Sequence, residues 1–465
     1  MTSIVWIRKD LRLHDNPSLY HAAEAGDVLP VYIFDEDEEI GAAQKWFLHH
    51  ALDSFQRRLD SVGGKLYILK GSPAKILPEL AEKFQASSIH WNRQYEPSVF
   101  KRDREIGEAL YKTGVNVNTY EGRLLLPPWD VKKNDGEPYK VFTPFYKALQ
   151  KHEVPQALPS VKKMDTISFN KKDSLSLNEL KLLPEINWTA GMEKRWTPSE
   201  EAAVRRFHAF IDKKLKVYKT QRDFPADEAS SALSPYFALG LLSVRSVYHT
   251  VKKTAEAAGE PFLRQLVWRD FAYSLITHFP ETETDPMNDQ FKHFKWMDED
   301  DQFDAWKKGK TGFPIVDAGM RELWSTGYMH NRVRMVVGSF LTKDLLIHWR
   351  KGADWFDDTL VDADVANNVM GWQWVAGSGA DASPFFRIFN PTTQSKKFDP
   401  DGEYIKKWVP ELREMPSKHI HDPSGAPEDA LKEAGVNIGK DYPKPIVDHK
   451  AARLRALDRY DDVKK

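Results

Sequence analysis

The chain has 465 residues, enough for about two to four domains of ~100–200 residues each, and it carries 67 basic against 68 acidic side chains. It has no cysteine, which excludes disulfides, thiolate metal sites and cysteine nucleophiles, and its histidines show no metal-ligand spacing. Because the total charge is close to zero, binding to nucleic acid would require a local basic patch.

The N-terminus and the hydropathy of the chain indicate where the protein acts. The first twenty residues, MTSIVWIRKDLRLHDNPSLY, mix charges into a short apolar run and lack the uncharged core of a signal peptide. No stretch approaches the ~20 consecutive apolar residues of a membrane-spanning helix. We therefore expect a cytoplasmic protein without a membrane partner.

Residues 1–130 alternate short apolar runs with amphipathic segments. The runs SIVWI, VLPVYIF, KLYILKG, SSIHW and VNVNTYE have the length and composition of buried strands. Strands separated by helical segments indicate a parallel sheet with crossover helices, so we predict an α/β domain of the nucleotide-binding kind. A ligand of such a domain would bind beyond the carboxyl ends of its strands.

The remainder of the chain divides into an irregular segment and a helical one. Residues 131–199 contain clusters of Pro, Lys and Ser, which predict a long connection between domains. Thr197 and Pro198, followed by glutamates in TPSEEAAVRRF, are typical of a helix N-terminus. Helical periodicity then continues, so we predict a large all-α domain over residues 200–465.

Two segments early in the helical region are candidates for binding anions. DKKLKVYKTQR, residues 212–222, has five basic residues and one acid, which suits a nucleic-acid contact or a solvated helix face. In EASSALSPYFALG, Ser234 is predicted to cap a helix whose first residue is Pro235. Together with Ser230 and Ser231, that helix start would offer hydroxyls and N–H groups to a phosphate, although a simple capped helix explains the same pattern.

The segment FLRQLVWRDFAY places an aromatic ring beside hydrogen-bonding groups. Gln265, Trp268 and Arg269 have the i, i+3, i+4 spacing of one helical face. Proteins hold planar bases with such a combination of ring, amide and guanidinium. The alternative is a tryptophan at a domain interface with the arginine in a salt bridge.

Two later segments continue this pattern. Asn331, Arg334 and Met335 share a helical face in GYMHNRVRM, and Arg334 is expected to pair with Asp362 or Asp364, since an isolated buried charge is very costly. In DADVANNVMGWQW, the residues Asp364, Asn368 and Trp372 are spaced i, i+4, i+8, so an acid, an amide and an indole would line one side of a helix. That side suits a polar and aromatic ligand.

Three tryptophans could form an internal chain of oxidisable rings. They are Trp296, Trp349 and Trp372. Spacing alone does not bring them together, and tryptophans of helical domains usually belong to the core.

The ordered motifs of the chain have a family likeness. They are VWIRKDLRLHDN, KVFTPF, QRDFPA, WRDF, GKTGFPIVDAGMR, MHNRVRM, DADVANN, GWQW and FFRIFNPTTQ. With this set the chain resembles the photolyase/cryptochrome family over essentially its whole length, and within it the class I cyclobutane pyrimidine dimer photolyases. The resemblance implies an N-terminal antenna domain, a C-terminal helical domain that binds FAD, and DNA containing pyrimidine dimers as the partner.

The resemblance assigns roles around the flavin. Asn368 matches the residue that faces flavin N5, Arg334 and Asp362 match an ion pair beside the isoalloxazine, and Trp372, Trp349 and Trp296 match the chain that passes electrons inward. The implied FAD-binding residues are Tyr218, Ser230, Ser231, Ala232, Leu233, Ser234, Arg334, Asp362, Ala363, Asp364 and Asn368.

The resemblance also implies the reaction and the residues that hold the lesion. Reduced FAD, excited by blue light, would give one electron to a flipped-out dimer, whose ring splits before the electron returns. Trp268 and Trp374 would sandwich the dimer, and Gln265, Asn331 and Met335 would contribute to its active site. Further residues that would hold the DNA around it are Arg222, Arg269, Arg332, Arg387 and Gln394.

Gln265 departs from the pattern of the cyclobutane photolyases and leaves alternatives open. Gln265 stands where cyclobutane photolyases commonly carry glutamate and six-four photolyases glutamine, whereas Asn331 and Met335 stand where six-four enzymes carry histidines. We favour the cyclobutane dimer, with a cryptochrome photoreceptor, a (6-4) photolyase or a tryptophan-rich binding protein without photochemistry as alternatives.

The second chromophore is not fixed by the motifs. Folate-type members carry an Asn-Glu pair where this chain has Ser98 and Val99, so both a folate (methenyltetrahydrofolate) and a deazaflavin remain candidates for the antenna. A monomer suffices for one lesion pocket, and we expect a monomer.

Overall fold

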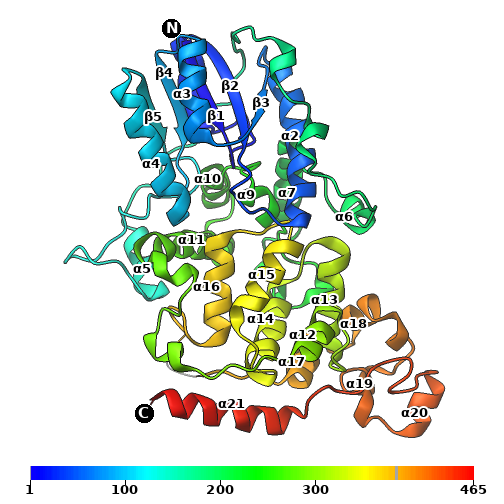
Figure 1. Ribbon diagram of the computed structural model, residues 1–465. Coiled ribbons are helices and arrows are strands. Elements are labelled where there is room, and N and C mark those ends of the chain that lie inside the picture. The colour runs from blue at the N-terminus through cyan, green and yellow to red at the C-terminus, as the bar shows by residue number, and fades with distance from the viewer. Residues whose placement is uncertain (1, 383–385, 465) are drawn as a thin grey trace.

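The N-terminal part of the chain folds as a doubly wound α/β domain. A computed structural model describes residues 2–382 and 386–464. Five parallel strands lie in the order β3-β2-β1-β4-β5, and Figure 1 shows them above the helical part of the molecule. The strands are β1 (Thr2–Ile7), β2 (Asp27–Phe34), β3 (Tyr67–Lys70), β4 (Ser88–Asn92) and β5 (Asn116–Tyr120), with α1 (Pro17–Ala25), α2 (Ala42–Ser61), α3 (Pro73–Lys83) and α4 (Pro97–Lys112) between them.

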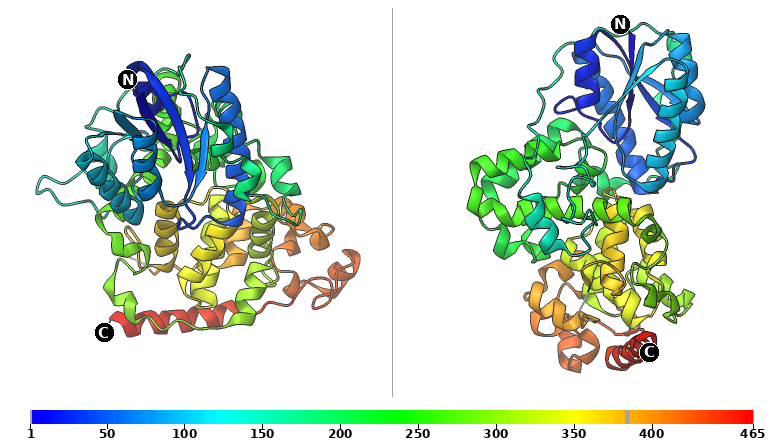
Figure 2. Two further views of the ribbon diagram at one scale, coloured as in Figure 1. Left: turned by 45° about the horizontal axis from the view of Figure 1, so that its top comes forward. Right: turned by 90° about the vertical axis from the view of Figure 1, so that its left-hand side faces the viewer.

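Alternation along β1 explains why helices cover both faces of the sheet (Figure 2). Ile4 and Trp6 pack in one core with side chains of α3 and α4, whereas Val5 and Ile7 pack in another with side chains of α1 and α2. Successive side chains of a strand point to opposite faces, so a strand that is apolar throughout must be buried on both. The predicted α/β fold is confirmed.

The remainder of the described chain is helical, and the predicted all-α architecture is also confirmed. The segment 131–199 contains α5 (Phe142–Leu149), α6 (Ala190–Arg195) and two short 3-10 helices, Lys171–Asp173 and Leu177–Leu180, within otherwise irregular chain. The helices that follow are α7 (Glu200–Lys213), α8 (Tyr218–Gln221), α9 (Ser234–Ala238), α10 (Val244–Thr254), α11 (Glu256–His278), α12 (Asp300–Lys307), α13 (Pro314–Thr326), α14 (Asn331–Ser339), α15 (Trp349–Thr359), α16 (Val365–Ala376), α17 (Pro391–Phe398), α18 (Glu403–Trp408), α19 (Ser417–Ile420), α20 (Glu428–Glu433) and α21 (His449–Lys464).

The start of α7 differs from the sequence prediction. Its N-cap is Ser199, whose side chain accepts a hydrogen bond from the backbone N–H of Ala202, so Thr197 and Pro198 lie before the helix rather than at its cap. A serine oxygen in the N-cap position satisfies one of the unpaired N–H groups of the first turn. Thr197 and Ser199 are both residue types that cap helices, and in the structure Ser199 is the cap.

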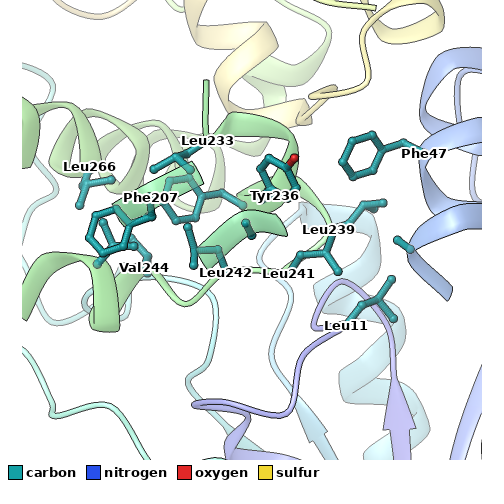
Figure 3. Packing of buried hydrophobic residues seen from close by; sticks show 14 of the residues in the cluster. Leu11, Phe47, Phe207, Leu233, Tyr236, Leu239, Leu241, Leu242, Val244 and Leu266 are labelled. Carbon is teal, nitrogen blue, oxygen red and sulfur yellow. The ribbon is translucent and has the colours of Figure 1, made fainter. Parts of the chain in front are cut away.

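Apolar side chains from both halves of the molecule form one core at their junction (Figure 3). Leu11 follows β1 and Phe47 belongs to α2, and both pack with Tyr236, Leu239 and Leu242 of the helical part. The rings of Phe47 and Tyr236 lie 5.8 Å apart at 74°, an edge-to-face contact. The two parts therefore share a continuous hydrophobic core.

Buried polar groups fix the register of this junction. Arg12 is 2% exposed and donates to the carbonyl oxygens of Gly240 at 2.9 Å and Gly122 at 2.7 Å. Gly240 itself has φ 66°, and a β-carbon there would lie 2.1 Å from the carbonyl oxygen of Lys9, so only glycine allows this approach. A shift between the two parts would remove the hydrogen bond to Gly240, the acceptor that belongs to the helical part, and leave that side of a buried guanidinium unpaired.

Within the described ranges, no helix has the length and apolar character needed to cross a membrane.

Candidate functional site

The carboxylate of Asp362 lies where three segments of the helical part meet. Arg334 of α14 donates from one nitrogen to both carboxylate oxygens, at 3.0 and 2.8 Å, and the Ser234 hydroxyl donates at 2.5 Å. The carboxylate is almost fully buried, and a buried charge requires such partners. Arg334 therefore has the acidic partner that its sequence predicted, and of the two candidates it is Asp362.

Ser234 does not cap a helix, contrary to the sequence prediction. Leu233 holds the N-cap position of α9, Ser234 is the first helical residue, and no side-chain cap is formed. Its hydroxyl donates to the Asp362 carboxylate, and a hydrogen bond to a charged acceptor is about twice as strong as one between neutral groups. Just before it, Ala232 has φ 49°, a left-handed conformation that costs a non-glycine residue ~1–3 kcal/mol and is typical of ligand-binding segments.

Asp364, two residues further, belongs to a second buried cluster. One carboxylate oxygen accepts from Arg123 at 3.2 Å and from the Tyr273 hydroxyl, while the other accepts from the backbone N–H of Asn367 at 3.1 Å. Arg123 also contacts Glu96 at 3.4 Å. Burial raises the pKa of Asp364, but Arg123 and Arg269 outweigh it and hold the pKa below its usual value.

Helix α16 carries the predicted line of acid, amide and indole. Asp364 is its N-cap, the Asn368 side-chain amide donates to the carbonyl oxygen of Ala353 at 3.0 Å, and the Trp372 ring is 3% exposed. Their spacing places them on successive turns. Asn368 therefore has a fixed orientation before any ligand arrives.

An acidic residue that the sequence did not suggest lies beside Asn368. Burial raises the pKa of Asp357 to about 7, although a hydrogen bond from Asn368 acts in the opposite direction, and Asp354 and Asp364 raise the pKa further. A carboxyl that titrates near neutral pH next to a candidate flavin contact can hold or release a proton there. In the sequence it is one of many acids in DWFDDTLVDAD and carries no distinguishing pattern.

The three tryptophans lie in adjoining parts of the core. Trp349 and Trp372 belong to one buried cluster, and Trp296 packs against the same cluster from its edge. The His348 ring lies between Trp296, at 5.1 Å, and Trp349, at 5.6 Å. The tryptophans are therefore core or core-edge residues, as the sequence allowed. The role of the three tryptophans in electron transfer stays a prediction.

The tryptophans expected to hold a lesion come from two packed helices, α11 and α16. Trp268 on α11 stacks on Phe142, with ring centroids 3.7 Å apart and planes at 5°. Trp374 on α16 has the Arg387 guanidinium 5.9 Å from its ring. Gln265 is only weakly held, because its amide donates to the Pro261 carbonyl at 3.4 Å, so its side chain can turn to a ligand.

Arg269 has a different setting from the other residues expected to touch DNA. Its guanidinium donates to the carbonyl oxygen of Arg123 at 2.8 Å and lies 3.8 Å from the Asp270 carboxylate, with its side chain 11% exposed. Arg269 therefore has the buried salt bridge at a domain interface that was the alternative to a DNA contact in the sequence analysis. Arg269 thereby supports the cluster around Asp364.

The remaining predicted residues line the neighbouring surface. Asn331 is exposed and its amide contacts the Met335 sulfur at 3.9 Å, while Arg332 pairs with Asp223 at 3.1 Å. The Arg222 guanidinium lies 5.7 Å from the ring of Tyr218. The other members are placed as follows: Gln394 half-buried on α17, Ser230 and Ser231 before α9, Leu233 buried, and Ala363 accepting a hydrogen bond from Gln44 at 2.7 Å.

Arg123 and Tyr273 were missed by sequence reasoning. Arg123 lies 241 residues from Asp364, so no local spacing relates them. One signal was available, since Arg123 is a single charge directly before the apolar run LLLPP, and a charge in such a position needs a buried partner.

Comparisons with known proteins identify the family of the chain. Residues 3–162 match the family model described as DNA photolyase, and residues 262–462 match the FAD binding domain of DNA photolyase. A deoxyribodipyrimidine photo-lyase from Agrobacterium fabrum is 48% identical over 99% of this chain and 98% of its own length. The chain belongs to the photolyase/cryptochrome family.

Solved structures of the family superpose on the whole chain. A bacterial class III photolyase from Agrobacterium tumefaciens has a TM-score of 0.96 at 46% identity, covering 100% of this chain and 98% of its own. A cryptochrome from Synechocystis has a TM-score of 0.91 at 31% identity, with 98% of each chain covered. Family membership makes the helical part an FAD-binding domain of the photolyase type.

Replacing Arg334 with methionine is predicted to lower the free energy of unfolding by ~3 kcal/mol, because Asp362 would stay buried with Ser234 as its remaining partner. Urea denaturation measures the change. The matched control is Arg104→Met, which removes an exposed ion pair with Glu108 and should cost less than ~1 kcal/mol. Equal stability of the two variants would contradict the structural role of the Arg334–Asp362 pair.

Asp357 is predicted to titrate with a pKa of about 7 in the folded protein, against 3.8 in an unperturbed aspartate. Its folded form therefore binds more protons than the unfolded chain between these values, so stability falls as pH rises from about 4 to about 7 and Asp357→Asn removes that fall. Infrared difference spectra of wild type against Asp357→Asn follow the carboxyl band. A carboxyl already ionised at pH ~5 would sink the prediction.

Proposed function

We propose that the protein is a light-driven DNA photolyase that repairs cyclobutane pyrimidine dimers. The observation that carries the proposal is the composition of α16 and of its neighbour α11. Asp364 caps α16, the first half of this helix carries Asn368 and its second half Trp374, while α11 contributes Trp268 and Gln265. Flavin-type contacts and base-stacking rings thus occupy adjacent helices, as electron transfer between a cofactor and a base requires.

The residues present fit FAD. Asp362 is neutralised by Arg334 and Asp364 by Arg123, so an anionic cofactor would not meet an unpaired carboxylate. Ser230 and Ser231 add hydroxyls near the start of α9, and Asn368 offers an uncharged amide. When bound and reduced, FAD supplies one electron after absorbing light.

The lesion would be held by two rings and an amide of the same two helices. Trp268 and Trp374 would stack on the two pyrimidines, and the Gln265 amide would hydrogen-bond their carbonyl groups. Stacking selects an extruded base, and a damaged base is the least costly to extrude. The other residues proposed for this surface are Arg222, Arg269, Asn331, Arg332, Met335, Arg387 and Gln394.

A basic surface next to the pocket suits the DNA backbone. Lys213, Lys216 and Lys219 are exposed in the segment 212–222, and Lys396 and Lys397 are exposed on α17. The two segments are neighbours, because the ring of Phe224 packs on Phe398 at 6.2 Å. Several lysines at one surface supply phosphate contacts that the neutral total charge of the chain does not reveal.

The class of photolyase is part of the proposal. The motifs favoured class I, whereas the solved Agrobacterium tumefaciens structure, 46% identical over the whole chain, is a class III photolyase. This identity, against 31% for the Synechocystis cryptochrome, favours class III. The second candidate function is a cryptochrome photoreceptor, favoured by the fold shared with the Synechocystis cryptochrome.

We propose an antenna chromophore in the α/β domain. A pocket open to solvent lies at the carboxyl ends of β1, β2 and β4, where parallel sheets bind ligands. Trp6 and Tyr32 line it together with Arg8 and Arg102, which lie 4.2 and 5.4 Å from the Trp6 ring. Asp35 and Glu38 also line the pocket and pair with Arg102 and Lys9, so its aromatic and polar lining suits a flat polar chromophore, either the deazaflavin or the folate.

The test uses an oligonucleotide with one cyclobutane thymine dimer, incubated with the reduced FAD-loaded protein in blue light and in the dark. Chromatography should show dimer-free product only after illumination, and the dependence on wavelength reports any antenna chromophore. An oligonucleotide with a (6-4) lesion is the matched control. Repair of the control alone would establish a (6-4) photolyase, and repair of neither would favour the cryptochrome.

A further inference from the structure

Phe142 lies outside the helices that form the proposed lesion pocket, yet it touches the pocket's main ring. It is the first residue of α5, in the segment between the α/β domain and α7, and its side chain is fully buried. Its ring is parallel to the Trp268 indole within 5°, at a centroid distance of 3.7 Å. Few aromatic pairs approach so closely, since stacked centroids usually lie about 4.5–7 Å apart.

Phe142 is in turn held by a polar and aromatic cluster. The Arg264 guanidinium lies 4.7 Å from the Phe142 ring and 5.0 Å from that of Tyr146. The hydroxyl of Tyr146, one turn along α5, donates a hydrogen bond to the Glu260 carboxylate at 3.0 Å. Arg264, Phe142 and Trp268 thus form a column in which a cation, a phenyl and an indole lie in succession.

The indole is covered by this column from one side while remaining half-buried overall. Phe271 packs on its edge at 5.8 Å and 71°, which limits rotation of the ring in its own plane. A ligand stacked on the Trp268 face not occupied by Phe142 would add the next layer of the column. A ring held in this way loses little conformational freedom when a ligand binds.

We infer that Phe142 is a positioning residue that holds Trp268 in the orientation needed to stack on the lesion. The inference rests on the proposed function, because it assigns Trp268 to the dimer. It also gives the segment 131–199 a part in the pocket, since α5 docks on α11 through this contact.

Phe142→Leu tests the inference, because leucine fills much of the same space without an aromatic face. The matched control is Phe145→Leu in the same helix. Phe145 is also buried, but its ring packs on Phe271 and Tyr139. We expect Phe142→Leu to weaken binding to dimer-containing DNA by about three- to tenfold, relative to undamaged DNA, and Phe145→Leu to leave this ratio unchanged.

A double-mutant cycle separates positioning from general destabilisation. In a Trp268→Ala background, Phe142→Leu should cause no further loss of dimer discrimination, since the ring that it positions is gone. Repair per absorbed photon in the saturated complex should also fall in Phe142→Leu and not in Phe145→Leu. If Phe142→Leu does not fold, Phe142→Met, with a flexible side chain of similar volume, takes its place.

The outcomes distinguish the role of Phe142 from the photolyase function on which it rests. Equal discrimination by the Phe142 and Phe145 variants, or additive losses in the cycle, would overturn the role of Phe142 and leave the photolyase proposal intact. A wild-type protein that does not distinguish dimer-containing from undamaged DNA would overturn both.

Discussion

The buried guanidinium of Arg123 is the interaction on which the arrangement of the site depends. It follows the last strand of the sheet and contacts Glu96 of the α/β domain, Tyr273 of α11 and Asp364 at the start of α16. Glu96 has a second cation in Lys9 at 3.1 Å, whereas the charges that stabilise the Asp364 carboxylate are Arg123 and, after it, Arg269. Loss of Arg123 would therefore leave the Asp364 carboxylate at the start of α16 without its main cation, while Glu96 keeps Lys9.

This constraint explains how a site assembled from distant segments can be exact in its geometry. Asp364 caps α16, so whatever fixes Asp364 also fixes the rotation of the helix and the directions of Asn368, Trp372 and Trp374. The second ion pair, between Arg334 and Asp362, anchors the residues that enter the helix. Both pairs serve orientation more than stability, because buried ion pairs gain little net free energy.

The sequence predicted what depends on local pattern and missed what depends on distant contacts. Apolar alternation predicted the sheet, periodicity predicted the helices, and the need to neutralise Arg334 predicted its acidic partner. The predicted cap failed at Ser234, because Ser234 is already the first helical residue of α9 and its hydroxyl is oriented by the hydrogen bond that it donates to Asp362, a contact made only in the tertiary fold. Arg123 could not be found by spacing, since its partners come from three separate parts of the chain.

The most direct test of this account is hydrogen exchange of the backbone amides of α16 in Arg123→Met. Arg93→Met is the control, since it removes a partly exposed ion pair with Glu121 in the same domain. The account predicts that the first turns of α16 lose protection in Arg123→Met while amides of the central strand β1 stay protected. Unchanged exchange in α16 would contradict the claim that Arg123 holds this helix in place.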